Sequence, residues 1–263
     1  MQLGRFSEFD EPPRYLAAAR AGGFQLAVVL LFFALVLVGN LLLGRADAAE
    51  RTREASRSSW RGVLTLALGP PRVGVQIGHD GAAAHPDELR HLRGNTGGYA
   101  DGLSELAVNR SVARALQIRL EAHGITVDIL RATPPADYYA DLMLSLHADS
   151  VLDPDRQGYK SAHFRPPRSP LEPTLKTIID HSYLSATGVH DDSANTTGAM
   201  NGYYAFNFRS YEHTVHPATP ALLVELGYLS SPADAALLRQ PGRVADALTV
   251  GVVDFLRTRN RIP

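Results

Sequence analysis

The chain of 263 residues contains no cysteine. This absence excludes disulfide bonds, thiolate metal sites, a cysteine nucleophile and lipid attachment through a thiol. Lysine is almost as scarce, because Lys160 and Lys176 are the only two, and the formal net charge is −1. Without a run of lysine and arginine, the sequence lacks the basic patch of a nucleic-acid-binding protein. We therefore expect no nucleic-acid partner.

One long apolar run stands in a chain whose 45% hydrophobic and 20% charged residues are otherwise ordinary for a globular protein. Residues 24–43, "FQLAVVLLFFALVLVGNLLL", carry no charge and are flanked by Arg20 and Arg45. A run of this length spans a bilayer as a helix. We predict a transmembrane helix or signal-anchor over residues 24–43, which makes the chain a single-pass protein of the cell membrane.

Two features near this run leave alternatives open. Ala46-Asp47-Ala48 fits the A-x-A pattern of a cleavage site, so a cleaved signal peptide is the alternative, although the run is longer than most signal-peptide cores. More arginines follow the run than precede it, which by the positive-inside rule disfavours export of the C-terminal part. Long domains often translocate regardless of charge, and we expect the C-terminal domain on the extracytoplasmic side, in the periplasm or cell wall.

The rest of the chain divides around this run. Residues 1–23 form a short polar N-terminal head. Residues 44–70 combine helix formers with interleaved charge and end at a pair of prolines, which is typical of a juxtamembrane stalk. Residues 71–263 are long enough for one domain with a sizeable core.

Within that domain, strand patterns alternate with helix patterns. The strands are predicted at 72–79, 126–130, 141–147 and 221–229, and the main helices at 104–124, 171–188 and 241–258, with Ser231 as the N-cap of a further helix that starts at Pro232. Strands separated by helices indicate an α/β fold. We expect a mainly parallel twisted sheet of about six strands with helices on both faces.

Polar residues stand where the apolar strands end. His79 follows one strand, His147 follows another, Glu105 opens the long helix, and Glu225 lies within the apolar stretch "ALLVELGYL". The carboxyl ends of parallel strands share one edge of the sheet, so these groups can converge there. Two imidazoles and a carboxylate are the donors of hydrolytic zinc sites, in which a fourth position is left for water.

A buried carboxylate such as that of Glu225 is costly unless something pairs with it, and it suits a general base beside that water. No H-E-x-x-H pair is present, however. The spacing alone therefore leaves bland alternatives open: loop histidines at His79 and His147, a helix-start carboxylate at Glu105 and a structural ion pair at Glu225.

Four ordered motifs carry a resemblance to a known family. They are "QIGHDG" (76–81), "ELAVN" (105–109), "SLHAD" (145–149) and "PALLVELGYLSS" (220–231), supported by Arg131 and Gly158. In these stretches the sequence resembles the zinc-dependent N-acetylmuramoyl-L-alanine amidases of the type-3 amidase family, which are peptidoglycan hydrolases. The resemblance covers residues 72–258, so residues 71–263 are expected to be an amidase catalytic domain.

The resemblance implies a function and a set of site residues. Carried over by position, the Zn²⁺ ligands are His79, Glu105 and His147, and the general base is Glu225. The implied substrate is peptidoglycan, cut at the amide bond between N-acetylmuramic acid and L-alanine. The resemblance assigns no substrate-binding residue and leaves open whether a protein activator is needed.

The sequence departs from the family pattern in several places. Asp80 stands where the family has glycine, Asp149 stands where it has asparagine, and the segment 131–139, "RATPPADYY", is shorter than usual. No extra helix of the kind that plugs the zinc follows "SLHADS". None of these changes removes an implied ligand or the base.

Alternatives remain for the function and for one loop. The two alternative functions are a catalytically silent wall-binding scaffold of the same fold and a zinc hydrolase of another peptidoglycan amide bond. In the loop 188–207, Tyr203, Tyr204 and Phe206 either line a groove for a sugar–peptide polymer or belong to an edge strand, "YYAFNF". We favour the edge strand, and we note His213 and His216 as possible substrate contacts.

Overall fold

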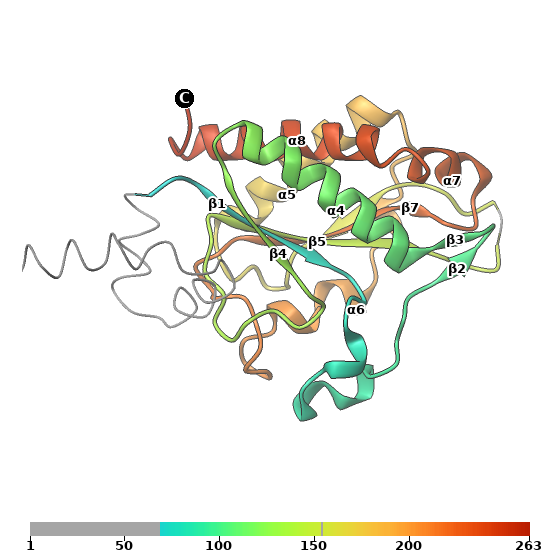
Figure 1. Ribbon diagram of the computed structural model, residues 1–263, viewed down its shortest axis with the longest axis horizontal. Helices are drawn as coiled ribbons and strands as arrows, with labels where there is room; N and C mark the ends of the chain where they lie inside the picture. Colours follow the sequence, from blue (N-terminus) through green and yellow to red (C-terminus); the bar gives the residue numbers. More distant parts are fainter. Residues whose placement is uncertain (1–68, 154) are drawn as a thin grey trace, which may run out of the picture. The chain divides into compact units, whose positions relative to one another are not determined.

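The computed structural model describes residues 69–153 and 155–263 (Figure 1). Within these ranges no helix is both long enough and apolar enough to cross a membrane. The predicted head, the predicted transmembrane helix at 24–43 and nearly all of the predicted stalk lie outside the described residues, so those assignments stay predictions.

The central sheet has five strands in the order β4-β1-β5-β7-β6. Four of them are parallel, and β6 runs antiparallel beside β7 at one edge. Their bounds are β1 Arg72–Ile77, β4 Thr126–Leu130, β5 Leu142–Asp149, β6 Lys160–Ala162 and β7 Ala221–Tyr228. A separate hairpin joins β2 Tyr99–Ala100 to β3 Leu103–Ser104. The predicted α/β fold with a mainly parallel sheet is confirmed, with five strands in the main sheet rather than six.

The helices follow the predicted periodic segments closely. The long ones are α4 Glu105–Ala122, α5 Leu171–Thr187 and α8 Pro241–Thr258, and the shorter ones are α6 Gly198–Asn201 and α7 Pro232–Leu238. Single 3₁₀ turns are η1 Ala82–Ala84, η2 Asp87–Leu92, η3 Ser193–Asn195 and η4 Tyr204–Phe206. Ser231 caps α7 as predicted, because its hydroxyl accepts a hydrogen bond from the N–H of Asp234.

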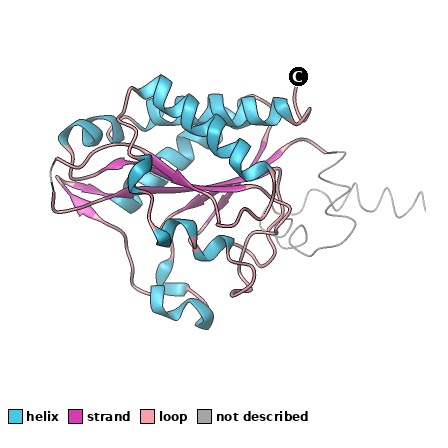
Figure 2. Cartoon of the chain, turned by 180° about the vertical axis from the view of Figure 1, so that it is seen from behind, coloured by secondary structure: helices cyan, strands magenta, loops and turns pink. Residues whose placement is uncertain are grey.

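The three long helices cover the same face of the sheet (Figures 1 and 2). Alternate residues of the strands point to this face, including Val75 of β1 and Leu144 of β5, and they pack with Leu116 of α4, Ile179 of α5 and Leu248 of α8 in one core. All five of these side chains are fully buried. This core fixes α4 against β1 and β5, and so it fixes the position of the helix N-terminus.

The opposite face corrects two predictions. Among the described residues, only short helical pieces cover it, α6 and η4, within a mostly irregular segment at 198–215, so the long helices of this part of the chain do not lie on both faces. The predicted edge strand "YYAFNF" is wrong, because Phe206 of η4 packs under the sheet against residues such as Met143 and Leu223. The edge strand is β6, which the sequence hides because it is three residues long.

Strand alternation also places the polar groups. His147 of β5 and Glu225 of β7 share the side of the sheet with Met143 and Leu223, because side chains two residues apart point the same way. Both lie toward the carboxyl ends of their strands. The site therefore forms at the edge of the sheet face that the long helices leave free.

Candidate metal centre

His79 stands two residues beyond the end of β1. The N–H of Gly78 still pairs with the carbonyl of Leu146 at 3.0 Å, and the chain then turns with a φ of 67° at His79. Nδ1 of His79 lies 3.1 Å from the carbonyl oxygen of Asn95. A Cβ at Gly78 would lie 2.5 Å from Cε1 of His147, so only glycine leaves room for that ring.

Glu105 is the first residue of α4, and its carboxylate joins the two histidines. Oε1 lies 3.1 Å from Nε2 of His79 and 2.9 Å from Nδ1 of His147. Oε2 accepts a hydrogen bond from the N–H of Gly98 at 2.9 Å. The carboxylate is therefore held in place by the backbone as well as by the rings.

His147 stands near the end of β5, opposite Tyr203. The rings of His79 and His147 meet edge to face, with 5.1 Å between their centres. Nδ1 of His147 faces Glu105, and Nε2 lies 3.1 Å from the hydroxyl of Tyr203. The ring thus has one nitrogen inside the cluster and the other against a tyrosine.

The electrostatics of the cluster favour a cation. Burial alone would raise the pKa of Glu105, but hydrogen bonds from His147 and His79 lower it well below its usual range. Burial alone would lower the pKa of His79, but the hydrogen bond and negative charge of Glu105 raise it above its ordinary value. The carboxylate of Glu105 is therefore ionised, and its negative charge favours a bound cation.

One donor atom from each residue lies within 4.8 Å of the others. Two imidazole nitrogens and a carboxylate oxygen are borderline donors that suit zinc and leave a position for water. A Cβ at Gly97 would lie 2.7 Å from Oε2 of Glu105, so the loop is built to pass close to these side chains. The three residues fit a divalent metal ion.

Glu225 stands directly beside this cluster. It is the register partner of His147 across the parallel β5–β7 pair. Oε2 of Glu225 is buried and has no hydrogen-bond partner among the described residues. Burial raises the pKa of Glu225 well above its ordinary value, and the negative charges of Glu105 and Asp149 raise it further, whereas Lys160 lowers it. A carboxylate without a partner at this position is free to take and return a proton.

A cavity of about 300 Å³ opens in front of the cluster. His79 and His147 stand in its lining, together with aromatic and imidazole side chains from two separate loops: His85, His91, Tyr203, Tyr204 and Tyr211. This lining shows that the segment at 198–215 forms one wall of the site. Tyr203 and Tyr204 therefore take the alternative position, in a groove.

Comparison with known proteins decides the family. Residues 73–254 match the family described as N-acetylmuramoyl-L-alanine amidase. The chain belongs to this family. The predicted resemblance and enzyme class, and the predicted hydrolysis of a peptidoglycan amide bond, are thereby confirmed.

Solved amidase structures share the fold of this amidase domain. An N-acetylmuramoyl-L-alanine amidase from Clostridium difficile 630 has a TM-score of 0.53 at 18% identity, over 72% of this chain and 98% of that one. The apo form of Ami1 from Mycobacterium abscessus has a TM-score of 0.53 at 20% identity, over 71% and 98%. The CwlD amidase from Clostridioides difficile, solved in complex with the GerS lipoprotein, has a TM-score of 0.50 at 15% identity, over 72% and 99%. No curated protein matches the chain by sequence.

Two departures from the family pattern have structural roles beside the amidase site. Asp80 pairs with Arg110 of α4, and its other oxygen lies 3.9 Å from Nε of Arg131, so it links three segments. Asp149 accepts a hydrogen bond from Nζ of Lys160 at 2.7 Å. Neither carboxylate belongs to the cluster of His79, Glu105 and His147.

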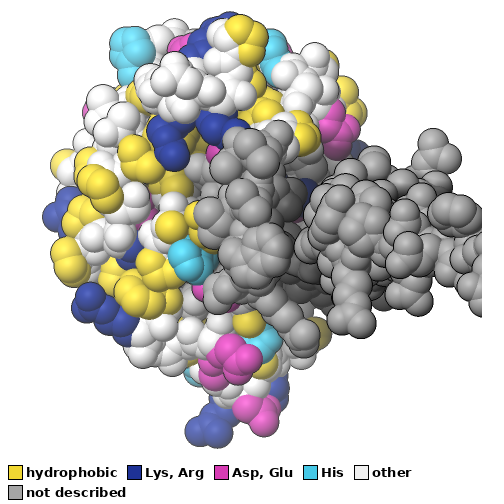
Figure 3. Space-filling view, turned by 90° about the vertical axis from the view of Figure 1, so that its left-hand side faces the viewer, with side chains coloured by type: hydrophobic (Ala, Val, Ile, Leu, Met, Phe, Trp, Pro, Cys, Tyr) yellow, Lys and Arg dark blue, Asp and Glu magenta, His cyan; other side chains and the backbone are white. Residues whose placement is uncertain are grey.

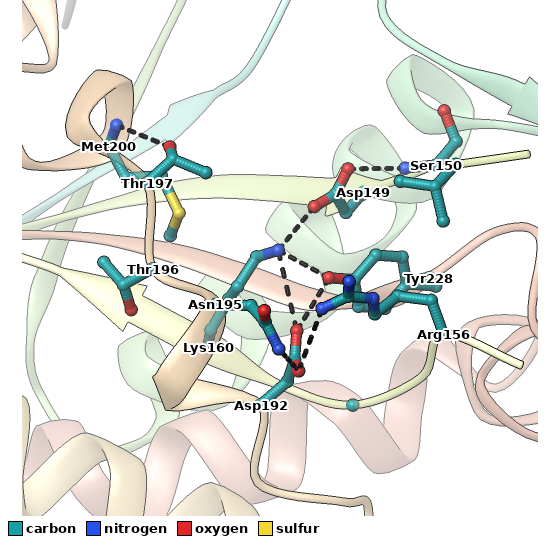
Figure 4. Close-up of polar contacts among 12 residues, drawn as sticks. Asp149, Ser150, Arg156, Lys160, Asp192, Asn195, Thr196, Thr197, Met200 and Tyr228 are labelled. Carbon is teal, nitrogen blue, oxygen red and sulfur yellow. Dashed lines mark hydrogen bonds and ion pairs between the residues drawn. The ribbon is translucent and has the colours of Figure 1, made fainter. Parts of the chain in front are cut away.

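Lys160 is the centre of a polar cluster with Asp149, Asp192 and Tyr228 (Figure 4). It is the register partner of Glu225 on the antiparallel β6, and its side chain is only 3% exposed. Its Nζ lies 2.6 Å from the hydroxyl of Tyr228, which donates to Asp192 at 2.7 Å. Apart from the rarity of lysine, no pattern in the sequence predicts this arrangement.

The two histidines noted as substrate contacts in the sequence each have another partner. His213 binds Glu88 with 2.9 Å between Nδ1 and Oε1, and His216 packs against Tyr139. Neither residue is in the lining of the cavity.

Basic side chains stand at separate places on the face drawn in Figure 3. Gln76 and Ser145, which lie beneath His147, were missed, although strand alternation puts both on its side of the sheet.

Proposed function

We propose that this chain is a zinc-dependent hydrolase that cleaves the amide bond between N-acetylmuramic acid and L-alanine in peptidoglycan. The observation that carries the proposal is the convergence of His79, Glu105 and His147 next to the unpartnered carboxylate of Glu225. A catalytically silent scaffold has no chemical need for three assembled donors and a free carboxylate together.

His79, Glu105 and His147 would hold the metal. Bound zinc polarises the carbonyl of the scissile amide and lowers the pKa of the attacking water. Glu225, opposite His147 in the sheet, takes the proton of that water on its carboxylate and returns it to the departing amine. Burial and the negative charges of Glu105 and Asp149 favour the first of these two transfers, because they make the carboxyl of Glu225 hold a proton more readily than an exposed one.

Product analysis tests the proposal. Purified full chain is incubated with sacculi beside a Glu225→Gln variant and a chelator-treated sample. We expect free stem peptides with a new L-alanine amino terminus from the zinc-loaded wild type alone. Peptides that end at another new amino terminus would instead indicate a zinc hydrolase of a different peptidoglycan bond, and binding of sacculi without release would indicate a silent scaffold.

We further propose that residues 24–43 anchor the chain in the cell membrane, with the catalytic domain on the extracytoplasmic side. The support is the uncharged apolar run itself and the location of peptidoglycan outside the membrane. Protease added to intact spheroplasts should degrade the catalytic domain while the N-terminal head survives. A catalytic domain released into the medium would show that the segment is a cleaved signal peptide, and a protected one would place it in the cytoplasm.

A further inference from the structure

A buried hydrogen-bond network lies beneath His147 and ends at Nε2, the ring nitrogen that faces away from the cluster. It contains Gln76 of β1, Ser145 of β5 and Tyr203 of the irregular segment. Gln76 and Ser145 are fully buried, and Tyr203 is 9% exposed. No step of the proposed reaction uses these residues, so their arrangement needs a separate explanation.

The direction of each hydrogen bond follows from one backbone carbonyl. The carbonyl oxygen of Ala132 can only accept, and it receives a bond of 2.5 Å from Nε2 of Gln76 and one of 2.6 Å from the hydroxyl of Tyr204. This fixes the Gln76 amide, because its NH₂ must face Ala132. Its Oε1 must then face Ser145 and Tyr203.

Oε1 of Gln76 therefore accepts from both neighbours. The hydroxyl of Ser145 donates to it at 2.5 Å, and the hydroxyl of Tyr203 lies 3.2 Å away. The hydroxyl of Tyr204 already donates its hydrogen bond to the carbonyl oxygen of Ala132. The proton of Tyr203 thus has an acceptor in Gln76, and the lone pairs of the Tyr203 oxygen are left for Nε2 of His147 at 3.1 Å.

We infer that Tyr203 is a positioning residue for the metal: its oxygen accepts the Nε2 proton of His147 and so keeps the lone pair of Nδ1 turned toward the cation. Neutral histidine has one ring proton, and a proton on Nδ1 would exclude the metal from that nitrogen. Outer partners of this kind fix the tautomer and orientation of metal-bound histidines. This inference rests on the proposed function.

The packing around Tyr203 supports a fixed partner. Its ring meets that of His147 edge to face at 5.6 Å and that of Phe206 at 5.1 Å. The geometry needs no movement of either ring to make the bond.

Zinc affinity tests the inference directly. The purified full chain competes for Zn²⁺ with a chromogenic chelator, and Tyr203→Phe is compared with Tyr204→Phe. The control removes a neighbouring hydroxyl that donates to Ala132, lies 3.3 Å from the Tyr203 hydroxyl and makes no hydrogen bond with His147. We expect Tyr203→Phe to bind Zn²⁺ roughly 10- to 100-fold more weakly, the usual loss for an outer partner. Tyr204→Phe should stay close to wild type.

A double-mutant cycle with Gln76→Leu separates positioning from general loosening. Loss of Oε1 leaves the Tyr203 proton free to turn toward His147, so Gln76→Leu should also weaken zinc binding. The double variant should bind no more weakly than Tyr203→Phe alone, because both changes act through one chain of bonds. Additive losses would overturn the inference.

The outcomes distinguish this inference from the proposed function. A wild type that binds no Zn²⁺ would overturn the proposed function itself. A wild type that binds Zn²⁺, with equal affinity in Tyr203→Phe, would overturn the positioning role alone, and so would an equal loss in Tyr204→Phe.

Discussion

Glu225 of β7 lies opposite His147 of β5 in the register of the parallel sheet. One residue is a proposed metal ligand and the other is the proposed base, so a single strand pairing sets their separation. Neither depends on a loop for its position. A rigid strand pair at the edge of the sheet is a good support for a reaction that needs a water between metal and base.

The position of the Glu225 carboxylate beside His147 lowers the stability of the metal-free protein. Burial raises the pKa of Glu225 above the value it has in the unfolded chain. At pH values below that ordinary pKa, Glu225 is protonated in both the folded and the unfolded chain, and the full stability of the fold is present. As the pH rises toward the raised pKa, the unfolded state releases its proton first, so the metal-free protein loses stability.

Glu225→Gln should therefore stabilise the chelated protein at pH 7 while it abolishes activity. The gain should vanish near pH 4, about the ordinary pKa of a glutamate. Thermal unfolding measures it, and each kcal/mol corresponds to roughly 2–4 °C in a domain of this size. Glu121→Gln on the exposed side of α4 is the control. A Tm for Glu225→Gln at or below the wild type at pH 7 would contradict this account.

Gly78→Ala should displace the His147 ring. The added Cβ would lie 2.5–2.7 Å from three ring atoms, which is closer than packed atoms approach. We expect a loss of zinc binding of at least about tenfold, comparable with the loss of an outer partner. Gly198→Ala, where nothing lies within 4 Å of the new Cβ, should bind Zn²⁺ as the wild type does. Equal affinities in the two variants would show that the ring has room to move.

We predict that the charged carboxylate of Glu88 stabilises the wall of the cavity at pH values above the ordinary pKa of a glutamate. The carboxylate accepts hydrogen bonds from the N–H groups of Glu212 and His213, and it thereby ties η2 to the segment that carries Tyr211. Burial alone would raise the pKa of Glu88, but these bonds lower it. Its contribution is present above the ordinary value and is lost as the pH falls through the lowered pKa.

Glu88→Gln should consequently lower the Tm at pH 7 and raise KM more than it changes kcat, because one wall of the cavity loosens. The difference in Tm between variant and wild type should begin to shrink as the pH falls below about 4, near the ordinary pKa of a glutamate, and should disappear below the lowered pKa. Unfolding curves at several pH values and steady-state kinetics check both parts. A difference in Tm that is independent of pH would show that the carboxylate charge has no part in it.

Lys160→Met should destabilise the domain far more than Lys176→Met. Lys160 is 3% exposed and lies between Asp149 and Asp192, so its removal takes this cation away from the buried Asp192 and from the partly exposed Asp149. Such a loss costs on the order of 3 kcal/mol. Lys176 pairs with Asp180 one turn away at a partly exposed position, where a pair contributes about 0.5 kcal/mol. Denaturant unfolding of both variants decides, and equal losses would refute the difference.

Strong periodic signals in the sequence were reliable guides to the fold. The spacing of apolar residues predicted α4, α5 and α8 to within two residues of their ends, and β4 matched at both ends. The three helices bury apolar stripes that recur at helical spacing, so their pattern is local. The three-residue β6 has no such pattern, and its pairing with β7 comes only from tertiary contacts.

The residues of the site also divide into those that the sequence pattern predicts and those that it does not. His79, Glu105, His147 and Glu225 stand at the ends or in the middle of recognisable elements, and the structure brings them together. Tyr203 reaches His147 from 56 residues away, through an irregular segment whose path no periodicity specifies. The segment resembled a strand because "YYAFNF" is rich in aromatic residues, yet Tyr203 and Tyr204 line the cavity and Phe206 packs under the sheet.

The most direct measurement is anomalous diffraction at the zinc edge from crystals of the zinc-loaded chain. The account predicts one strong peak within about 2.0–2.2 Å of His79, Glu105 and His147, the usual distances for zinc with nitrogen and oxygen ligands. Glu225 should lie beside the peak without binding it. A peak held by other residues, or none between these three, would contradict the proposal that this cluster is the catalytic metal centre.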